Sequence, residues 1–177
     1  MNKLKRIIVW LRRIRHCRGF GIQSPTDYRF ARYVVGERWP YYAYDELQVA
    51  DADWLHSKVG RLCLRLANEL QPDVIVDHAD FGIWLRAGCR RARIVKQLPP
   101  VGESYGLAVV AVGDDLTALM DRAAERSVLL VVDLWRNRRR WAAVAADARV
   151  SVSFDLYYCG IAFFDPHRNK KAYVVNF

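Results

Sequence analysis

Short apolar segments alternate with helix-like segments through residues 73–177, and this alternation constrains the fold more than any other feature. Buried strands are predicted where valine, isoleucine and leucine cluster, over residues 74–76, 94–95, 107–112 and 128–132. Helices are predicted between and after these strands, over residues 81–89, 114–126 and 135–148. Strands that alternate with helices are typical of βαβ units. The pattern therefore predicts an α/β domain with a mostly parallel sheet.

The C-terminal part of the chain breaks this alternation. Residues 150–158, 161–164 and 172–177 all have extended patterns, and no helix separates them. The segment 165–169, between the last two, is rich in turn-forming residues. We therefore expect the last two strands to form an antiparallel hairpin that completes the sheet.

Three helices are predicted ahead of the first strand, as a helical arm over residues 1–71. The second helix begins at Ser24 and Pro25, because serine caps a helix and proline suits its first position. Asp27 stands where the acid of a capping box would lie. The third helix is predicted over 52–70, with a core stripe of Leu55, Val59, Leu62, Leu66 and Leu70. We expect the arm to pack on the domain of residues 72–177, so that the chain forms one compact unit.

The first helix combines an apolar stripe with many cations. The stripe has the spacing of one helix face and consists of Leu4, Ile7, Ile8, Leu11 and Ile14. Regularly spaced apolar residues suit a packed surface, so we expect the stripe to dock on the domain while the arginines face solvent. The alternatives are that this helix lies on an anionic membrane, binds nucleic acid or builds a homo-oligomer.

The chain is strongly basic, with 28 lysines and arginines against 19 acidic residues and a net charge of +9. Residues 1–18 contain no acid, and a second dense run of arginines covers 136–140. Such a field favours an acidic partner, namely nucleic acid, anionic lipid or an acidic protein. The arginines expected to meet this partner are Arg12, Arg13, Arg15, Arg136, Arg138, Arg139 and Arg140. The alternative is that these runs are simply solvated helix faces.

Several kinds of protein do not fit the sequence. No apolar run approaches the roughly 20 residues that span a bilayer, and the N-terminus lacks a signal-peptide pattern, so we expect a cytoplasmic protein. The four cysteines and four histidines are scattered, which predicts neither a metal site nor a disulfide framework. No Ser–His–Asp or Cys–His set occurs at a recognisable spacing, which argues against nucleophilic catalysis.

Motifs along nearly the whole chain point to a known family. A G-F-G-x-x-S-P segment over 19–25 is followed by a tyrosine-rich stretch over 41–44. Later, a valine-rich strand closes on Asp133, Trp141 lies within a helix, and the segment 155–164 reads D-L-x-x-x-G-I-x-F-F. In this order the motifs resemble short bacterial members of the class I S-adenosylmethionine-dependent methyltransferase-like family.

The resemblance implies a fold and a cofactor. The fold is the Rossmann-like class I methyltransferase fold, a mostly parallel sheet that ends in an antiparallel hairpin. The segment 98–106 is too short for the helix and strand that the family has there, so the sheet is expected to contain about six strands. The implied cofactor is S-adenosylmethionine.

The resemblance also assigns residues to the cofactor loop. In the family, the first strand ends in an acid and a glycine-rich turn, which implies Asp77, Ala79 and Gly82 as cofactor-binding residues here. Glycine suits such a turn because it tolerates positive φ and close approach of a ligand. Only Gly82 of these glycines remains, and Ala79 and Asp80 narrow the loop. The loop is therefore expected to bind the cofactor weakly or not at all.

Two further positions follow from the ends of later strands. The acid that would bind the ribose is replaced by Lys96 or Gln97, and Gln97 is the residue expected near the ribose. Asp133 follows a buried strand at the edge where open α/β sheets place their ligands, so it is the expected catalytic residue facing the methyl acceptor. The alternative is that Asp133 caps a helix, as Asp114 or Asp115 is expected to do.

Two functions therefore stand side by side. The first is a methyltransferase-like protein with weakened or lost cofactor binding. The second is a non-catalytic module that keeps the fold and binds an acidic partner through its basic surface. The sequence names no methyl acceptor.

Overall fold

The computed structural model describes residues 3–39, 41, 43–44, 47 and 53–177. The helical elements are α1 (Lys3–Arg12), η1 (Ile14–Gly19), α2 (Pro25–Phe30), η2 (Ala31–Val35), α4 (Trp54–Leu70), α5 (Gly82–Gly88), α6 (Leu116–Asp121), η3 (Leu134–Arg136) and α7 (Arg138–Ala146). The strands are β1 (Val74–Asp77), β2 (Arg93–Val95), β3 (Tyr105–Ala111), β4 (Ala123–Val132), β5 (Val152–Asp155), β6 (Cys159–Phe164) and β7 (Lys171–Val174).

The strands form one mixed sheet in the order β2-β1-β3-β4-β6-β5-β7. The first four are parallel, and β6 runs antiparallel to both β4 and β5. This confirms an α/β fold with a mostly parallel sheet and an antiparallel hairpin. Two details of the expectation are wrong. The sheet has seven strands rather than about six, and the hairpin joins β5 to β6 rather than the last two strands.

The last strand, β7, lies beside β5 rather than β6, because the turn after β6 carries the chain across to the far side of β5. β7 pairs with β5 in parallel, with Val152 opposite Lys171 and Asp155 opposite Val174. A turn-rich linker predicts a reversal of direction, but it does not say which edge is still free. Since β6 is already flanked by β4 and β5, the free edge of the hairpin belongs to β5.

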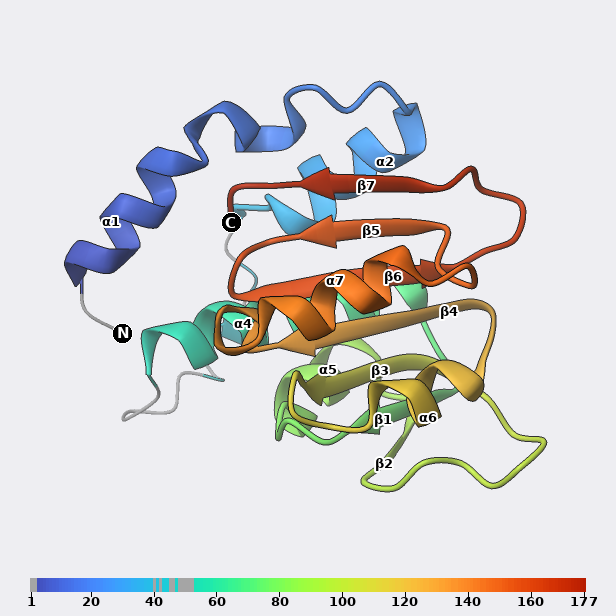
Figure 1. Cartoon of the computed structure of the whole chain (residues 1–177). Coiled ribbons are helices and arrows are strands. Elements are labelled where there is room, and N and C mark those ends of the chain that lie inside the picture. The colour runs from blue at the N-terminus through green and yellow to red at the C-terminus, as the bar shows by residue number, and fades with distance from the viewer. Residues whose placement is uncertain (1–2, 40, 42, 45–46, 48–52) are drawn as a thin grey trace.

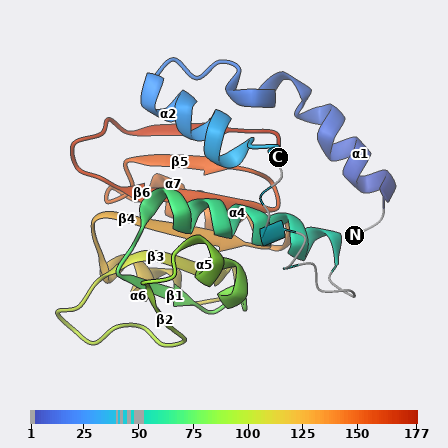
Figure 2. The ribbon, with the colours of Figure 1, turned by 180° about the vertical axis from the view of Figure 1, so that it is seen from behind.

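Helices cover both faces of the sheet. Figure 1 shows α6 and α7 in front of the strands, and Figure 2, from behind, shows α2, α4 and α5 on the other face. Each face has its own apolar cluster. One gathers α2, η2, α4 and α5, and the other gathers α6, η3 and α7. The parallel strands are consequently buried on both sides, which explains why their sequences are apolar without alternation.

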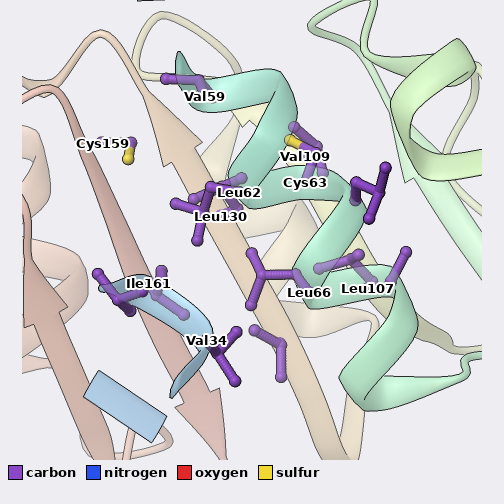
Figure 3. Packing of buried hydrophobic residues seen from close by; sticks show 14 of the residues in the cluster. Val34, Val59, Leu62, Cys63, Leu66, Leu107, Val109, Leu130, Cys159 and Ile161 are labelled. Atoms are coloured by element: carbon purple, nitrogen blue, oxygen red, sulfur yellow. The ribbon is translucent and has the colours of Figure 1, made fainter. Parts of the chain in front are cut away.

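Helix α4 forms the centre of the larger cluster. Its residues Val59, Leu62, Cys63 and Leu66 follow one face at helical spacing and are buried. Figure 3 shows them against side chains of β3, β4 and β6, with Val34 of η2 beside them. This confirms the expected third helix and its stripe, and Gln71 ends it in the left-handed conformation.

The second helix begins as expected but its acid has another role. Ser24 accepts a hydrogen bond from the Asp27 amide at 3.3 Å, and Pro25 takes the first helical position. The Asp27 carboxylate, however, is buried and binds Arg168 and the Tyr173 hydroxyl. The acid's half of the expected capping box is therefore wrong, because the Asp27 carboxylate instead ties the arm to the C-terminal part of the chain.

Two other helices are shorter than predicted. The helix expected over 114–126 ends at Asp121, and β4 already begins at Ala123. The register between β3 and β4 shifts at this end, and Arg126 has positive φ, so a bulge rather than a helix makes the connection. The helix expected over 135–148 is divided into η3 and α7 at Asn137, whose side chain caps α7.

The expected docking of the first helix is also wrong. α1 has no buried residue, and its stripe is exposed, with Ile7 at 55% and Leu11 at 54%. Figures 1 and 2 both show α1 at the periphery of the molecule. In the described part of the chain, no helix combines the length and the apolar character that crossing a membrane requires.

Candidate functional site

Asp77 ends β1 and is fully buried. Its Oδ1 accepts hydrogen bonds from the backbone amides of Ala79, at 3.2 Å, and Phe81, at 3.1 Å. Asp80 lies between them with φ at 60°, in the left-handed region. One carboxylate oxygen of Asp77 is thus used to fold the loop that follows it.

The other oxygen of Asp77 faces a lysine. Lys96 follows β2, the parallel neighbour of β1, and its Nζ lies 3.4 Å from Asp77 Oδ2 and 2.5 Å from Asp80 Oδ1. The hydrogen bond from Lys96 lowers the pKa of Asp80, and the same bond raises the pKa of Lys96. The ammonium therefore bridges the two aspartates at the edge where the cofactor loop was expected.

The rest of the loop is packed inward. Phe81 is 4% exposed, and its ring stacks on His56 at a centroid distance of 4.6 Å. Trp84, at the start of the next helix, is 1% exposed and lies against Gly60 of α4, where a Cβ would come 2.5 Å from its ring. The loop is closed by aromatic side chains rather than left open by glycines.

The four residues expected to bind the cofactor lie at different places. Asp77 is inside the loop, and Gly82 begins α5 beside it, where a Cβ would stand 3.4 Å from Asp77 Oδ2. Ala79 and Gly82 line separate hollows. Gln97 is exposed and lines a third hollow of about 380 Å³ with Pro99 and Pro100. The structure thus brings Asp77 and Gly82 together, whereas Gln97 lines a different hollow.

A pocket of about 340 Å³ lies at the C-terminal ends of β1 and β4, next to the beginning of α4. Its lining includes Asp133, Trp135 and Arg136 from the segment after β4, together with His56 and Phe81. Asp133 has φ at 61°, and its Oδ2 is 3.1 Å from Arg136 Nε. The side chain of Asp133 makes no capping hydrogen bond, so the alternative of a helix cap is wrong for this residue.

Of the two aspartates expected to cap a helix, Asp114 and Asp115, only Asp115 does so. Asp115 accepts hydrogen bonds from the amides of Thr117 and Ala118 and caps α6, as expected. Asp114 instead accepts from the Ala111 amide and lies 3.6 Å from His78 Nδ1. The histidine follows Asp77 directly, so Asp114 connects the ends of β1 and β3.

Sequence reasoning missed two members of this edge. Lys96 was considered only as a substitute at the ribose position, although a cation directly after β2 can reach the acid at the end of β1 in a parallel sheet. His56 carried no local signal, because it lies on α4, before the first strand. Its place against Phe81 depends on how α4 crosses the sheet.

The tyrosine-rich stretch fills space rather than lining this pocket. Tyr44 is buried, its hydroxyl accepts a hydrogen bond from Arg65, and its ring lies 6.3 Å from that of Trp84. Tyr41 packs against Tyr44. Tyr42 lies outside the described residues.

The arginines expected to meet an acidic partner fall into two groups. The first group contains four arginines that bind other parts of the chain. Arg13 and Arg138 bind Asp155, Arg136 binds Asp133, and Arg140 donates to two carbonyls of the loop after β3. Within the described residues, Arg12, Arg15 and Arg139 are exposed and form no ion pair. Among the residues that the structure describes, these three arginines therefore have no acidic partner in the chain itself.

Comparison with models of protein families found none that matches this chain. A search of curated proteins gave no match either.

Proposed function

We propose that this chain is an S-adenosylmethionine-dependent methyltransferase-like protein in which cofactor binding is weakened or lost. Support comes from the parallel strands completed by a hairpin and from a buried acid, Asp77, at the end of the first strand. The observation that carries the second half of the proposal is the bridge from Lys96 to Asp77 and Asp80.

Charge explains why this bridge opposes the cofactor. S-adenosylmethionine carries a cationic sulfonium and a cationic amino group, and Asp77 is the acid expected to hold the amino group. Lys96 already supplies a cation there, and both oxygens of Asp77 have partners. A bound cofactor would have to displace Lys96 or accept a like charge next to it.

Methyl transfer depends on positioning more than on acid–base chemistry. The nucleophile, the methyl carbon and the sulfur must lie in line for the transfer. A protein that cannot hold the cofactor cannot align these atoms, so its rate of methyl transfer is lost. If a cofactor is held, Asp77 and Gly82 would contact its methionine end, Gln97 would lie near the ribose, and Asp133 would face the acceptor in the pocket with Trp135.

Calorimetry on the full chain tests the proposal. We expect no detectable heat with S-adenosylmethionine or its demethylated product at about millimolar concentration. Micromolar binding of either compound would overturn the claim of weakened binding. A thermal-shift measurement with the same compounds serves as the second readout, because a ligand that binds the folded state raises the unfolding temperature.

A second candidate function is a non-catalytic module that binds an acidic partner, whether nucleic acid, anionic lipid or protein. The observation that favours it is that three of the expected arginines, Arg12, Arg15 and Arg139, are exposed and form no ion pair within the described part of the chain. This function predicts binding to the partner that weakens steeply as salt is added, because each neutralised anion releases counterions.

A further inference from the structure

Helix α1 is attached to the rest of the protein through its basic side. The guanidinium of Arg6 lies 3.9 Å from the centre of the Trp54 ring, at the beginning of α4. Arg13, directly after α1, binds Asp155 at the end of β5. Val9, between these two in the helix, is half-buried. These positions repeat at helical spacing, so one side of α1 faces the protein.

The opposite side of α1 is apolar and faces outward. Ile7, Ile8 and Leu11 are 55%, 40% and 54% exposed, and Ile14, in the turn after the helix, is 48% exposed. An amphipathic helix of a globular protein normally buries this face against the core. Here the orientation is inverted, since Arg6 and Arg13 contact the protein while Ile7, Ile8 and Leu11 remain about half exposed.

Backbone contacts keep α1 in this orientation. The Asn176 side chain donates a hydrogen bond to the Trp10 carbonyl, and the Asn176 backbone N–H donates to the His16 carbonyl. Arg13 Nη1 also donates to the Asp155 carbonyl at 2.9 Å. These contacts thus fix both the end of α1 and the turn that follows it. The outward orientation of the apolar face is therefore set by specific hydrogen bonds.

Cations border the outward face. Lys3, Lys5, Arg12 and Arg15 are exposed, and residues 1–18 contain no acid. We propose that α1 docks the protein on an anionic lipid surface, with Ile7, Ile8 and Leu11 inserted among the acyl chains and these cations at the headgroups. A helix with aliphatic side chains on one face and lysines and arginines beside them lies in the plane of such an interface.

Other occupants fit this face less well. Nucleic acid satisfies the cations, but it offers no continuous apolar surface to cover the isoleucines and leucine. A second copy of α1 would cover them, but it would bring the same uncompensated cations into contact. An anionic bilayer satisfies both requirements together. The inference does not depend on whether the loop at Asp77 binds a cofactor.

Co-sedimentation with vesicles tests the inference on the full chain. We expect binding to phosphatidylcholine vesicles that contain phosphatidylserine, much weaker binding to phosphatidylcholine alone, and weaker binding in high salt. Ile7→Asp and Leu11→Asp should each weaken binding by about tenfold or more, because each removes one inserted aliphatic side chain. Val101→Asp is the matched control, since Val101 is 85% exposed outside α1 and its change should leave binding as it was.

The remaining outcomes are equally decisive. Unchanged vesicle binding by Leu11→Asp would overturn the assignment to α1, and so would failure of the wild-type chain to bind the anionic vesicles. A dimer in gel filtration that Leu11→Asp converts to a monomer, without vesicle binding, would assign the face to a second copy. Urea unfolding of the variants should match the wild type, because the replaced side chains are exposed.

Discussion

Arg13 Nη2 lies 2.8 Å from Asp155 Oδ1, although 142 residues separate them in the chain. Arg138 binds the same carboxylate from α7, so Asp155 joins the N-terminal arm, the end of β5 and a helix of the opposite layer. Burial alone would raise the pKa of Asp155, but the two arginines outweigh it and hold the pKa below its ordinary value. The carboxylate is therefore charged in the folded protein, and its charge supports the fold.

Replacing this carboxylate should destabilise the protein in a pH-dependent way. Asp155→Asn leaves two arginines without their anion, and we expect the free energy of unfolding to fall by about 3 kcal/mol at neutral pH. Because the folded pKa is depressed, the stabilisation is complete above the unfolded pKa of about 3.9 and is lost as pH falls through the folded value. Urea unfolding at several pH values should show the two proteins converging in acid. Asp73→Asn, on an exposed aspartate, should show no such difference at neutral pH.

The bridge from Lys96 should control access of cations to Asp77. Lys96→Gln removes the ammonium while keeping a polar side chain, so we expect it to raise the affinity for S-adenosylmethionine relative to the wild type. Calorimetry of both proteins measures this, and Lys171→Gln, on an exposed lysine of β7, is the matched control. Equal affinities of the Lys96 variant and the wild type would mean that the packing of Phe81, rather than charge, closes the loop.

Gly88 should be required for the contact between α4 and α5. A Cβ at Gly88 would come 2.2 Å from the Leu64 carbonyl oxygen, a backbone atom that cannot move without shifting α4. We expect Gly88→Ala to lower the free energy of unfolding by about 1–3 kcal/mol. Gly113→Ala is the control, because nothing lies within 4 Å of its added Cβ. Similar stabilities of the two variants in urea would contradict the expected clash.

Arg65 should be essential to the attachment of η2. It is buried and donates to the carbonyls of Val34 and Val35 and to the Tyr44 hydroxyl. Arg65→Met leaves these buried acceptors unsatisfied, so we expect a loss of about 3 kcal/mol in the free energy of unfolding. Arg29→Met breaks only an exposed pair with Glu69 and should cost less than about 1 kcal/mol. Chemical denaturation of both variants decides between them.

The thiols should differ sharply in reactivity. Burial raises the pKa of Cys63 and of Cys159, and Cys89 is buried as well, whereas Cys17 is half-buried. Because the thiolate is the reactive form, a thiol reagent at mildly alkaline pH should modify Cys17 first and the others only on unfolding. Mass spectrometry of the native chain at successive times gives the order, and early labelling of Cys63 would contradict the packing around α4.

The sequence predicted those features of the fold that depend on neighbouring residues. The stripe of α4, the start of α2 at Ser24 and Pro25, and the parallel strands all follow from local periodicity and capping. Features that depend on distant partners were missed. Asp27 looked like a capping acid but binds Arg168, and no local pattern indicates that β7 would lie beside β5.

The candidate site shows the same limit. The aspartates at the ends of β1 and β4 were found because each closes an apolar strand. The bridge from Lys96 depends on β2 lying next to β1, and the stacking of Phe81 on His56 depends on the crossing of α4. The outward face of α1 was mistaken for a docking face because helical spacing identifies a stripe but not its direction.

The two outermost strands of the sheet are both short and basic. β2 has three residues and begins with Arg93, and β7 has four and begins with Lys171. Unpaired strand edges otherwise invite pairing with the strands of another molecule, and charge and shortness both oppose this. Extension of the sheet by a second chain is thus disfavoured at either end. Any self-association of this protein should accordingly involve its helices rather than strand pairing, and the protein should resist aggregation through its sheet.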